Sequence, residues 1–272
     1  MNFRDIYKKR PRWSHKGDFG TVLVIGGSIR HTGSPIFNAM AALRAGADLA
    51  YLIGPQRAMD AAAHHAPDMI TEPLDGEFLM KHIPRALAIS EHANTCVIGG
   101  GLARSPQTYR AIRTFLKQCQ LPLVIDAEAI RAIAQNEKAV RGKTTIITPH
   151  ADEFRALTGV LPSTALRERE RAVQQAAFRF RAVILLKGNV DIISDGTRVV
   201  RNRTGTPYMT KGGFGDTLAG ICGALLARGI DPLQAASAAA YINGKAGERA
   251  AKKYGEGTLA SDALHAIANV IQ

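Results

Sequence analysis

Short runs of aliphatic and β-branched residues recur along the chain, and each ends in glycine or a polar residue. The run at 21–25 (TVLVI) is typical of a buried strand. Further runs of this kind cover 48–53, 95–98, 121–125, 145–148 and 182–186. Helical segments separate or follow them at 36–44, 105–119, 152–157 and 163–181. Because alternating strands and helices build parallel sheets, the pattern predicts an α/β fold with a mainly parallel central sheet and helices on both faces.

Turn and cap residues mark the ends of these elements. Ser34 and Pro35 predict a helix start, with Ser34 as the N-cap and Pro35 at the first helical position. Asp195-Gly196 lies between apolar segments at 190–194 and 197–201 and predicts a β-hairpin. Three more helices are expected at about 216–228, 232–253 and 261–271. Since no linker or internal repeat interrupts the chain, we expect residues 1–272 to form a single domain.

Composition limits the class of protein. The 272 residues are 46% hydrophobic, which is enough for a large core, and no apolar run is long enough to cross a bilayer. The N-terminus lacks the apolar segment of a secretory signal. Cys96, Cys119 and Cys222 are an odd number of thiols without a paired spacing. We therefore expect a cytoplasmic protein whose cysteines are reduced core residues.

The net charge is +12, and +5 of it lies in a basic N-terminal arm at about residues 1–16. The arm holds six Lys or Arg side chains against one carboxylate. Such a balance allows binding of nucleic acid or of small polyanions such as nucleotides. No recognition helix, zinc motif or aromatic RNA-binding motif accompanies it, so nucleic acid is the less favoured partner.

The segment from Lys211 to Gly220 is the strongest candidate for a functional site. Three glycines lie within 212–215, and Asp216 and an apolar helical run follow them. Glycines let a ligand approach the backbone, and the N-terminus of a helix attracts anions, so the segment predicts a phosphate site. Asp216 has two interpretations, as the N-cap of the helix or as a general base that accepts a hydroxyl proton during phosphoryl transfer. The loop alone slightly favours the N-cap.

Glycines and polar residues follow the other predicted strands at the same end. They are Gly26-Gly27-Ser28, Gly99-Gly100-Gly101, Asp126, His150 and Lys187-Gly188. Ligands of open α/β sheets bind beyond the carboxyl ends of the strands. Each segment alone predicts only a tight turn, but the five together favour one shared site.

The segment 149–153 combines a histidine with two carboxylates at an expected helix start. Glu153 is a candidate to hold Mg²⁺ through a water molecule, while His150 faces the substrate. Acidic residues in a first helical turn also complement the helix dipole. That simpler interpretation explains Asp152 and Glu153 but not His150.

Three familiar motifs are incomplete in this chain. Gly142-Lys143-Thr144 lacks the first glycine of a P-loop, because Glu137 occupies that position. Gly99 and Gly101 lack the third glycine of a dinucleotide fingerprint, because Arg104 stands there. No His-Glu-x-x-His or Gly-x-Ser-x-Gly pattern occurs, so a zinc or serine hydrolase is not expected.

Taken together, the motifs resemble those of a known family. The segments 212–216 (GGFGD), 148–153 (TPHADE) and 186–188 (LKG) resemble the ribokinase-like superfamily. The segments 15–28, 41–47 and 98–102 are more closely similar to the NAD(P)H-hydrate dehydratase family, the C-terminal half of YjeF-type proteins. The similarity runs from about residue 11 to residue 265.

The resemblance implies a ribokinase-like fold and a repair activity. Members of the family dehydrate the damaged (6S)-hydrates of NADH and NADPH (NADHX and NADPHX). They phosphorylate the 6-hydroxyl with ADP or ATP and then eliminate phosphate, and ADP is the nucleotide expected here. Mg²⁺ is the implied cofactor. A homo-oligomer is the implied assembly, with a tetramer as a common form. Without an N-terminal epimerase domain, the chain is expected to act on the S epimer.

The resemblance also implies roles for individual residues. Asp216 corresponds to the base, and the backbone N–H groups of Gly213, Phe214 and Gly215 stabilise the phosphoryl group. Contacts to the hydrate would come from Ser34, Gly101, His150 and Asp216. Contacts to the nucleotide would come from Lys187, Gly188, Asn189, Val190, Asp191 and Gly215. The chain departs from the family pattern at Gly100, where Pro is usual, and at Glu128, Lys211 and Phe214.

Two alternative functions stay open at this stage. The first is a ribokinase-like kinase of a small hydroxylated metabolite, which would use the same Asp216 but release a stable phosphate ester. The second is a non-catalytic nucleotide- or RNA-binding protein that uses the basic arm.

Overall fold

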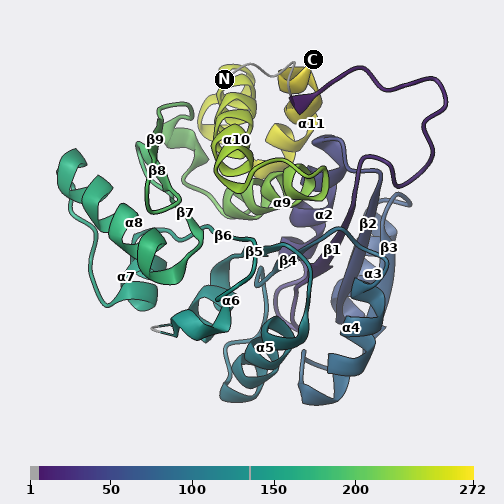
Figure 1. Cartoon of the computed structure of the whole chain (residues 1–272). Coiled ribbons are helices and arrows are strands. Elements are labelled where there is room, and N and C mark those ends of the chain that lie inside the picture. The colour runs from purple at the N-terminus through teal and green to yellow at the C-terminus, as the bar shows by residue number, and fades with distance from the viewer. Residues whose placement is uncertain (1–5, 135) are drawn as a thin grey trace.

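The apolar runs of the sequence lie side by side in one sheet, as the computed structural model shows (Figure 1). The structure describes residues 6–134 and 136–272. Within them, the sheet has nine strands in the order β3-β2-β1-β4-β5-β6-β7-β8-β9. The strands are β1 Thr21–Ile25, β2 Leu49–Pro55, β3 Ile70–Leu74, β4 Thr95–Ile98, β5 Leu123–Ile125, β6 Thr145–Ile147, β7 Val183–Leu186, β8 Asp191–Ser194 and β9 Val199–Asn202.

The first seven strands are parallel, and β8 and β9 form an antiparallel hairpin at one edge. Every residue of β1, β4, β5, β6 and β7 is buried. Parallel strands covered on both faces read as continuous apolar runs, which is why the sequence revealed them. The α/β class, with its mainly parallel sheet, is confirmed.

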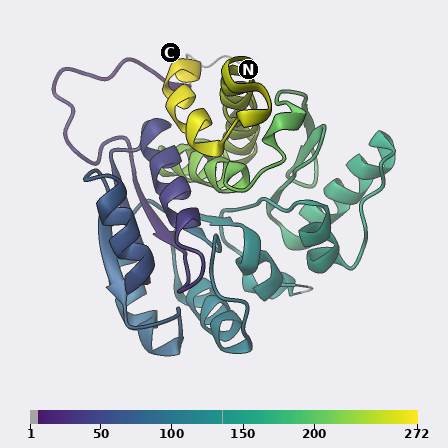
Figure 2. The same ribbon diagram turned by 180° about the vertical axis from the view of Figure 1, so that it is seen from behind.

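Ten α-helices within the described residues cover the two faces of the sheet (Figures 1 and 2). One face carries α2 Gly33–Arg44, α3 Gln56–His65, α9 Phe214–Ala227, α10 Pro232–Tyr254 and α11 Ala260–Ile271. The other carries α4 Ile83–Ser90, α5 Pro106–Gln118, α6 Ala127–Ala132, α7 Ala151–Thr158 and α8 Leu166–Phe180. Alternate residues of β1 divide between the two cores, because successive strand side chains point to opposite faces. Val22 and Val24 pack with α9, and Leu23 and Ile25 pack on the other side.

Several sequence expectations need correction. Helix α2 begins at Gly33 with Thr32 as its N-cap, so Ser34 lies inside the first turn and is not the cap. The elements α3, β3, α4 and α6 were not anticipated from the apolar pattern. Of the predicted basic arm, residues 1–5 lie outside the described residues. From residue 6 onward the arm packs on the domain, where the Arg10 guanidinium lies 2.7 Å from the Asp48 carboxylate.

Two further expectations agree with the structure. Cys96, Cys119 and Cys222 are buried and free. Among the described helices, none combines the length and the apolar character that spanning a bilayer requires.

Helix α9 is held against α2 by residues without bulky side chains. A Cβ built on Gly220 would overlap the carbonyl oxygen of Asn38 in α2. A Cβ on Gly223 would lie 2.5 Å from a methyl group of Val97 in β4. Glycine is therefore required at both positions, and it lets α9 lie close to both α2 and the sheet.

Replacing Gly220 with alanine should lower the free energy of unfolding by roughly 1–3 kcal/mol, because the added methyl group pushes α9 away from α2. This cost should exceed the gain of about 1 kcal/mol that alanine has over glycine in a helix. Urea unfolding measures the difference. Gly257→Ala is the control, because a Cβ there meets nothing within 4 Å. Equal stabilities of the two variants would contradict this account of the α2–α9 contact.

Candidate functional site

The segments that follow five of the strands meet at one edge of the sheet, as the sequence predicts. The backbone N–H of Gly27, after β1, donates to the carbonyl of Gly100, after β4, at 2.8 Å. The Lys187 ammonium, after β7, lies 3.0 Å from the Asp126 carboxylate, after β5. These contacts join the ends of β1, β4, β5 and β7 into one crevice.

A buried ion cluster forms the floor of this crevice. Lys187 Nζ lies 3.0 Å from Asp126 Oδ1 and 3.6 Å from Glu153 Oε2. The hydroxyl of Thr148 donates to the same Asp126 oxygen at 2.8 Å. Burial acts to lower the pKa of Lys187, but the two carboxylates outweigh it and the pKa is raised. Lys187 therefore stays a cation throughout the physiological range.

His150 and Glu153 form the start of α7. Nδ1 of His150 accepts the backbone N–H groups of Asp152 and Glu153 at 3.1 and 3.4 Å. Glu153 Oε2 accepts the backbone N–H of His150 at 2.9 Å, which completes a capping box. Helix-start chemistry thus explains His150 as well as its neighbours, contrary to the sequence argument. Its exposed ring nevertheless lines the pocket described below.

Asp216 lies in the first turn of α9 and is not its N-cap. Gly213 occupies the N-cap position with φ +98, so the N-cap interpretation of Asp216 is wrong. The Ser34 side chain lies near the Asp216 carboxyl group and acts to lower its pKa. The backbone carbonyl of Asp216 accepts the side-chain N–H of Asn38 at 2.7 Å. Asn38 of α2 therefore holds the backbone of Asp216.

The surroundings of Asp216 raise its pKa to about 7. The main cause is removal of the carboxylate from water, and the second is repulsion from the buried Asp126. Lys187 and Ser34 act in the opposite direction but do not cancel these effects. A carboxyl group with a pKa near neutrality can accept a proton at physiological pH, which is what general-base catalysis needs.

Gly100 gives Asp216 room. A Cβ at this position would lie 2.7 Å from Asp216 Oδ1 and 2.9 Å from Asn38 Oδ1. A side chain there would collide with both groups. Glycine at this unusual position thus fits the approach of Asp216 to the loop after β4.

A pocket of about 830 Å³ opens beside the first turn of α9. Of the sequence-predicted residues, His150, Lys187, Gly188, Asn189, Asp191, Phe214 and Gly215 line it. Ser34 and Gly101 do not line it but lie together on another side of Asp216, with the Cβ of Ser34 3.1 Å from the Cβ position of Gly101. Val190 packs against the core instead. Glu153, Gly213 and Asp216 do not line the pocket either, but Asp216 directly follows Gly215 of the pocket wall, and its Oδ1 lies with Ser34 beside Gly100.

The sequence argument missed part of the pocket wall. Arg203, the segment 204–207, Met209, Asn243 and Gly244 also line it. Asn243 binds the α9 turn, since it donates to the Phe214 carbonyl at 3.2 Å and accepts from the Thr217 hydroxyl at 2.7 Å. A polar Asn-Gly pair inside the alanine-rich helix α10 was the available signal.

Asp191 and Lys211 fix two loops of the pocket. The Asp191 carboxylate accepts the N–H of Gly188 and the side-chain N–H of Asn202, each at 2.9 Å. Burial raises its pKa, and these hydrogen bonds oppose that change. The Lys211 ammonium donates to the carbonyl of Glu256. Both side chains therefore shape the pocket wall as well as adding charge to it.

Magnesium fits this site only in part. Within residues 6–134 and 136–272 there is no group of three or more side chains that could enclose a metal ion. Both oxygens of Glu153 already contact His150 or Lys187. Mg²⁺ commonly takes one or two carboxylates together with phosphate oxygens and water. The residues thus suit an ion carried mainly by the phosphates of a nucleotide.

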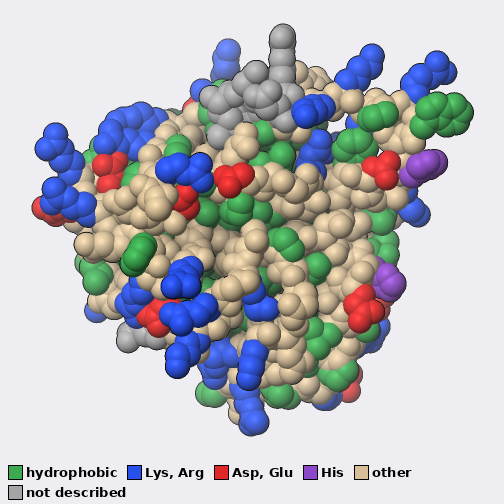
Figure 3. Space-filling model, viewed as in Figure 1, with side chains coloured by type: hydrophobic (Ala, Val, Ile, Leu, Met, Phe, Trp, Pro, Cys, Tyr) green, Lys and Arg blue, Asp and Glu red, His purple; other side chains and the backbone are tan. Residues whose placement is uncertain are grey.

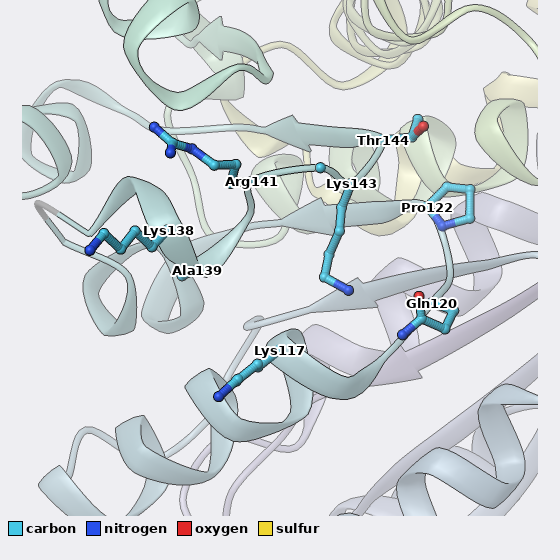
Figure 4. A pocket seen from close by; sticks show the side chains of 9 residues that line it. Lys117, Gln120, Pro122, Lys138, Ala139, Arg141, Lys143 and Thr144 are labelled. Carbon is cyan, nitrogen blue, oxygen red and sulfur yellow. The ribbon is translucent and has the colours of Figure 1, made fainter.

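A second hollow, of about 500 Å³, lies where strands β5 and β6 begin, at the end of the sheet opposite to the crevice (Figure 4). It contains Lys117, Lys138, Arg141 and Lys143, where the sequence had suggested an incomplete P-loop. In the view of Figure 3, which is that of Figure 1, Lys and Arg side chains gather on the surface over α5 and α6. In Figure 4, Lys138 and Arg141 point away from Lys143, so the cations do not converge on one position. The hollow is a basic surface remote from Asp216.

Comparison with known proteins agrees with this geometry. A family model described as NAD(P)H-hydrate dehydratase matches residues 22–269. The ADP-dependent (S)-NAD(P)H-hydrate dehydratase of Cenarchaeum symbiosum is 39% identical, with 99% of this chain and 94% of the relative covered. The bifunctional NAD(P)H-hydrate repair enzyme Nnr of Pyrobaculum aerophilum is 44% identical over 95% of this chain. The chain spans only about half of that relative, 52% of its length.

A solved structure extends the likeness to three dimensions. The ADP/ATP-dependent NAD(P)H-hydrate dehydratase of Bacillus subtilis, crystallised with ATP and Mg²⁺, superposes with a TM-score of 0.83 at 25% identity. The match covers 99% of this chain and 94% of that one. A family model that spans nearly the whole chain and a relative matched over nearly its full length place this chain in the NAD(P)H-hydrate dehydratase family.

Proposed function

We propose that this protein dehydrates the (6S)-hydrates of NADH and NADPH in a reaction driven by ADP or ATP. The observation that carries the proposal is the placement of Asp216, a carboxyl group with a pKa of about 7 next to both a nucleotide-sized pocket and the Ser34–Gly101 corner. The names of the matched relatives support the substrate and the nucleotide. ADP is the preferred nucleotide in this proposal because the relatives from Cenarchaeum symbiosum and Nitrosopumilus maritimus are named for it.

The two sides of Asp216 suit two substrates. The pocket wall offers Lys187, Gly188, Asn189 and Asp191 to the nucleotide, with Phe214 and Gly215 at its inner end. The hydrate would lie toward Ser34 and Gly101, with the exposed ring of His150 at the junction. Its 6-hydroxyl would then face Asp216 on one side and the terminal phosphate on the other.

The reaction proceeds in two balanced steps. Asp216 accepts the proton of the 6-hydroxyl while the oxygen attacks the terminal phosphorus, and the bond to the bridging oxygen breaks to release AMP or ADP. The phosphorylated C6–O bond then breaks, the neighbouring ring carbon gives its proton to the departing phosphate, and the double bond of the dihydronicotinamide is restored with release of hydrogen phosphate. Phosphorylation converts a poor leaving group into a good one.

The first turn of α9 provides the anion site. The backbone N–H groups of Gly213, Phe214 and Gly215 lie at the positive end of the helix dipole, where they can donate to the phosphoryl oxygens. Mg²⁺ would supply further neutralisation of the phosphate charge, with Glu153 as the protein side chain that orients it through water. The backbone N–H groups and Mg²⁺ would both stabilise the negative charge that develops on the phosphoryl oxygens during transfer.

Incubation of the purified protein with S-NADHX, magnesium and each nucleotide tests the proposal. Recovery of the NADH absorbance band together with stoichiometric phosphate supports it. A stable phosphate ester without recovered NADH would show a kinase instead. The same material, passed over a sizing column, tests the expected homo-oligomer.

Asp216→Asn should reduce turnover by roughly 10²–10⁴-fold, because it removes the proton acceptor. Nucleotide binding should persist, since asparagine removes a charge that repels phosphate. The melting temperature should hardly change, because asparagine has nearly the same shape. Steady-state kinetics, calorimetric titration and thermal unfolding measure the three quantities. A variant that dehydrates S-NADHX at close to the normal rate would remove Asp216 as the base.

The rate should depend on the ionisation of Asp216. Its raised pKa leaves the carboxyl group protonated at low pH, so kcat/KM should rise through about pH 7 and fall by about tenfold per unit below it. A pH profile of hydrate turnover measures this limb. The residual activity of Asp216→Asn should lack the limb, and an identical limb in that variant would assign it to another group.

Glu153→Gln should raise the magnesium concentration needed for half-maximal rate, because the neutral amide orients the hydrated ion less well. Asp152→Asn is the matched control, since Asp152 is exposed in the same helical turn. Magnesium titrations at fixed nucleotide measure the effect. Equal magnesium requirements in the two variants would remove Glu153 from the metal site.

A further inference from the structure

Asp126 is the most constrained carboxylate of the crevice. The residue is 3% exposed, and its Oδ1 receives both the Thr148 hydroxyl and the Lys187 ammonium. The backbone is equally fixed. Ala127 has φ +48, and a Cβ on Gly99 would overlap the Asp126 carbonyl oxygen. A buried carboxylate whose Oδ1 is fixed by Thr148 and pairs with the Lys187 ammonium suggests a role in placing that ammonium.

The partner, Lys187, lies against the first turn of α9. Its Nζ is 3.4 Å from the position that a Cβ of Gly215 would occupy. Its backbone N–H donates to the carbonyl of Pro149 at 2.9 Å, and its carbonyl accepts from Arg169 at 2.8 Å. The ammonium thus sits beside the N–H groups that face the phosphoryl group, at the inner end of the pocket.

We propose that Asp126 is a positioning residue, which fixes the Lys187 ammonium beside Gly215 so that Lys187 contacts the phosphoryl group in transfer and not the purine of the nucleotide. The inference rests on the function proposed above and adds a role for Asp126. Lys187 keeps its proton throughout and donates to the non-bridging oxygens, while the hydroxyl proton passes to Asp216.

The physical reason is preorganisation. A free lysine side chain loses about 1.5–2 kcal/mol of conformational entropy when it is immobilised. Asp126 and Glu153 already hold the ammonium in the free enzyme. Little further conformational entropy is therefore lost when the transition state forms. Donors fixed before the reaction stabilise developing charge more effectively than donors that must reorganise.

Asp126 also acts on the base from a distance. Asp216 is faced by Asp126 after β5, by Lys187 after β7, by Glu153 in α7 and by Ser34 in α2. Asp126 is the largest charged contribution that raises the pKa of Asp216. Loss of the Asp126 charge lowers the pKa of Asp216 and displacement of Lys187 raises it, so the variants below are compared well above pH 7, where Asp216 is ionised.

A double-mutant cycle with Asp126→Asn and Lys187→Met tests the inference. Lys187→Met should lower kcat by roughly 10²–10³-fold, the usual loss for one preorganised donor. Asp126→Asn should lower kcat by roughly 10–100-fold, the size typical of a residue that orients a ligand from behind. In the Lys187→Met background, Asp126→Asn should cost nothing further. Independent, multiplicative losses would overturn the positioning role.

Nucleotide affinity separates the two ends of the pocket. Calorimetric titration with ADP and ATP should show nearly normal binding to Asp126→Asn. A collapse of binding with kcat unchanged would place Lys187 at the purine and contradict the inference. Glu128→Gln is the control, since Glu128 is two residues away but pairs with Arg104 and Tyr109. Thr148→Val, which loosens Asp126 without removing it, should give a smaller loss in the same direction if Asp126→Asn folds poorly.

A spectroscopic measurement keeps this test independent of the reaction. A partly buried ammonium held by two carboxylates should give a ¹H–¹⁵N signal, assigned by its absence in Lys187→Met. The signal should disappear in Asp126→Asn and persist in Glu128→Gln. Persistence in Asp126→Asn would refute the holding role, whereas failure of the unaltered protein to dehydrate S-NADHX would refute only the proposed function.

Discussion

One partly buried ammonium group allows three carboxylates to share the carboxyl edge of this sheet. Lys187 directly follows β7, and Asp126 directly follows β5. Glu153 lies in α7, and Asp216 lies nearby in the first turn of α9. Removing such charges from water is costly, and the ion pairs offset the cost only when their geometry is well defined. The close contacts among the strand ends provide that geometry. Burial of Asp216, reinforced by repulsion from Asp126, is the reason Asp216 holds its proton up to neutral pH.

The position of Asp216 depends on how little space α9 leaves between its neighbours. Gly220 brings the helix against the backbone of α2, and Gly223 brings it against β4. The first turn is then tied by Asn38 and Asn243, which bind carbonyl groups on either side of it. A carboxylate carried by so firmly packed a helix has little freedom to turn away from a substrate. The close packing of small residues is thus a condition for catalysis as much as for stability.

Much of this architecture could be predicted from the sequence because it depends on local patterns. The buried strands show as apolar runs, and the residues after them mark the crevice. Strand β3 was missed because it is a partly exposed edge strand that contains Pro73, and α3 because Pro55 precedes it with no side-chain cap. The surroundings of Asp216 were out of reach for a different reason. The sequence predicted that Gly100 and Asp126 share one site, but the raised pKa of Asp216 depends on its burial and on its distance from Asp126, which only the folded chain sets.

The alternation of side chains along β1 divides the contacts of this strand between the two hydrophobic cores. Val22 and Val24 support the layer that contains α9 and its carboxylate, while Leu23 and Ile25 support the layer of α4 to α8. Neighbouring positions in β1 therefore pack into different hydrophobic cores. Substitutions at Val22 or Val24 would change the packing under α9, which carries Asp216, and would leave the packing of the opposite helical layer unchanged. The parity of a residue number in this strand becomes a guide to which half of the molecule a substitution will disturb.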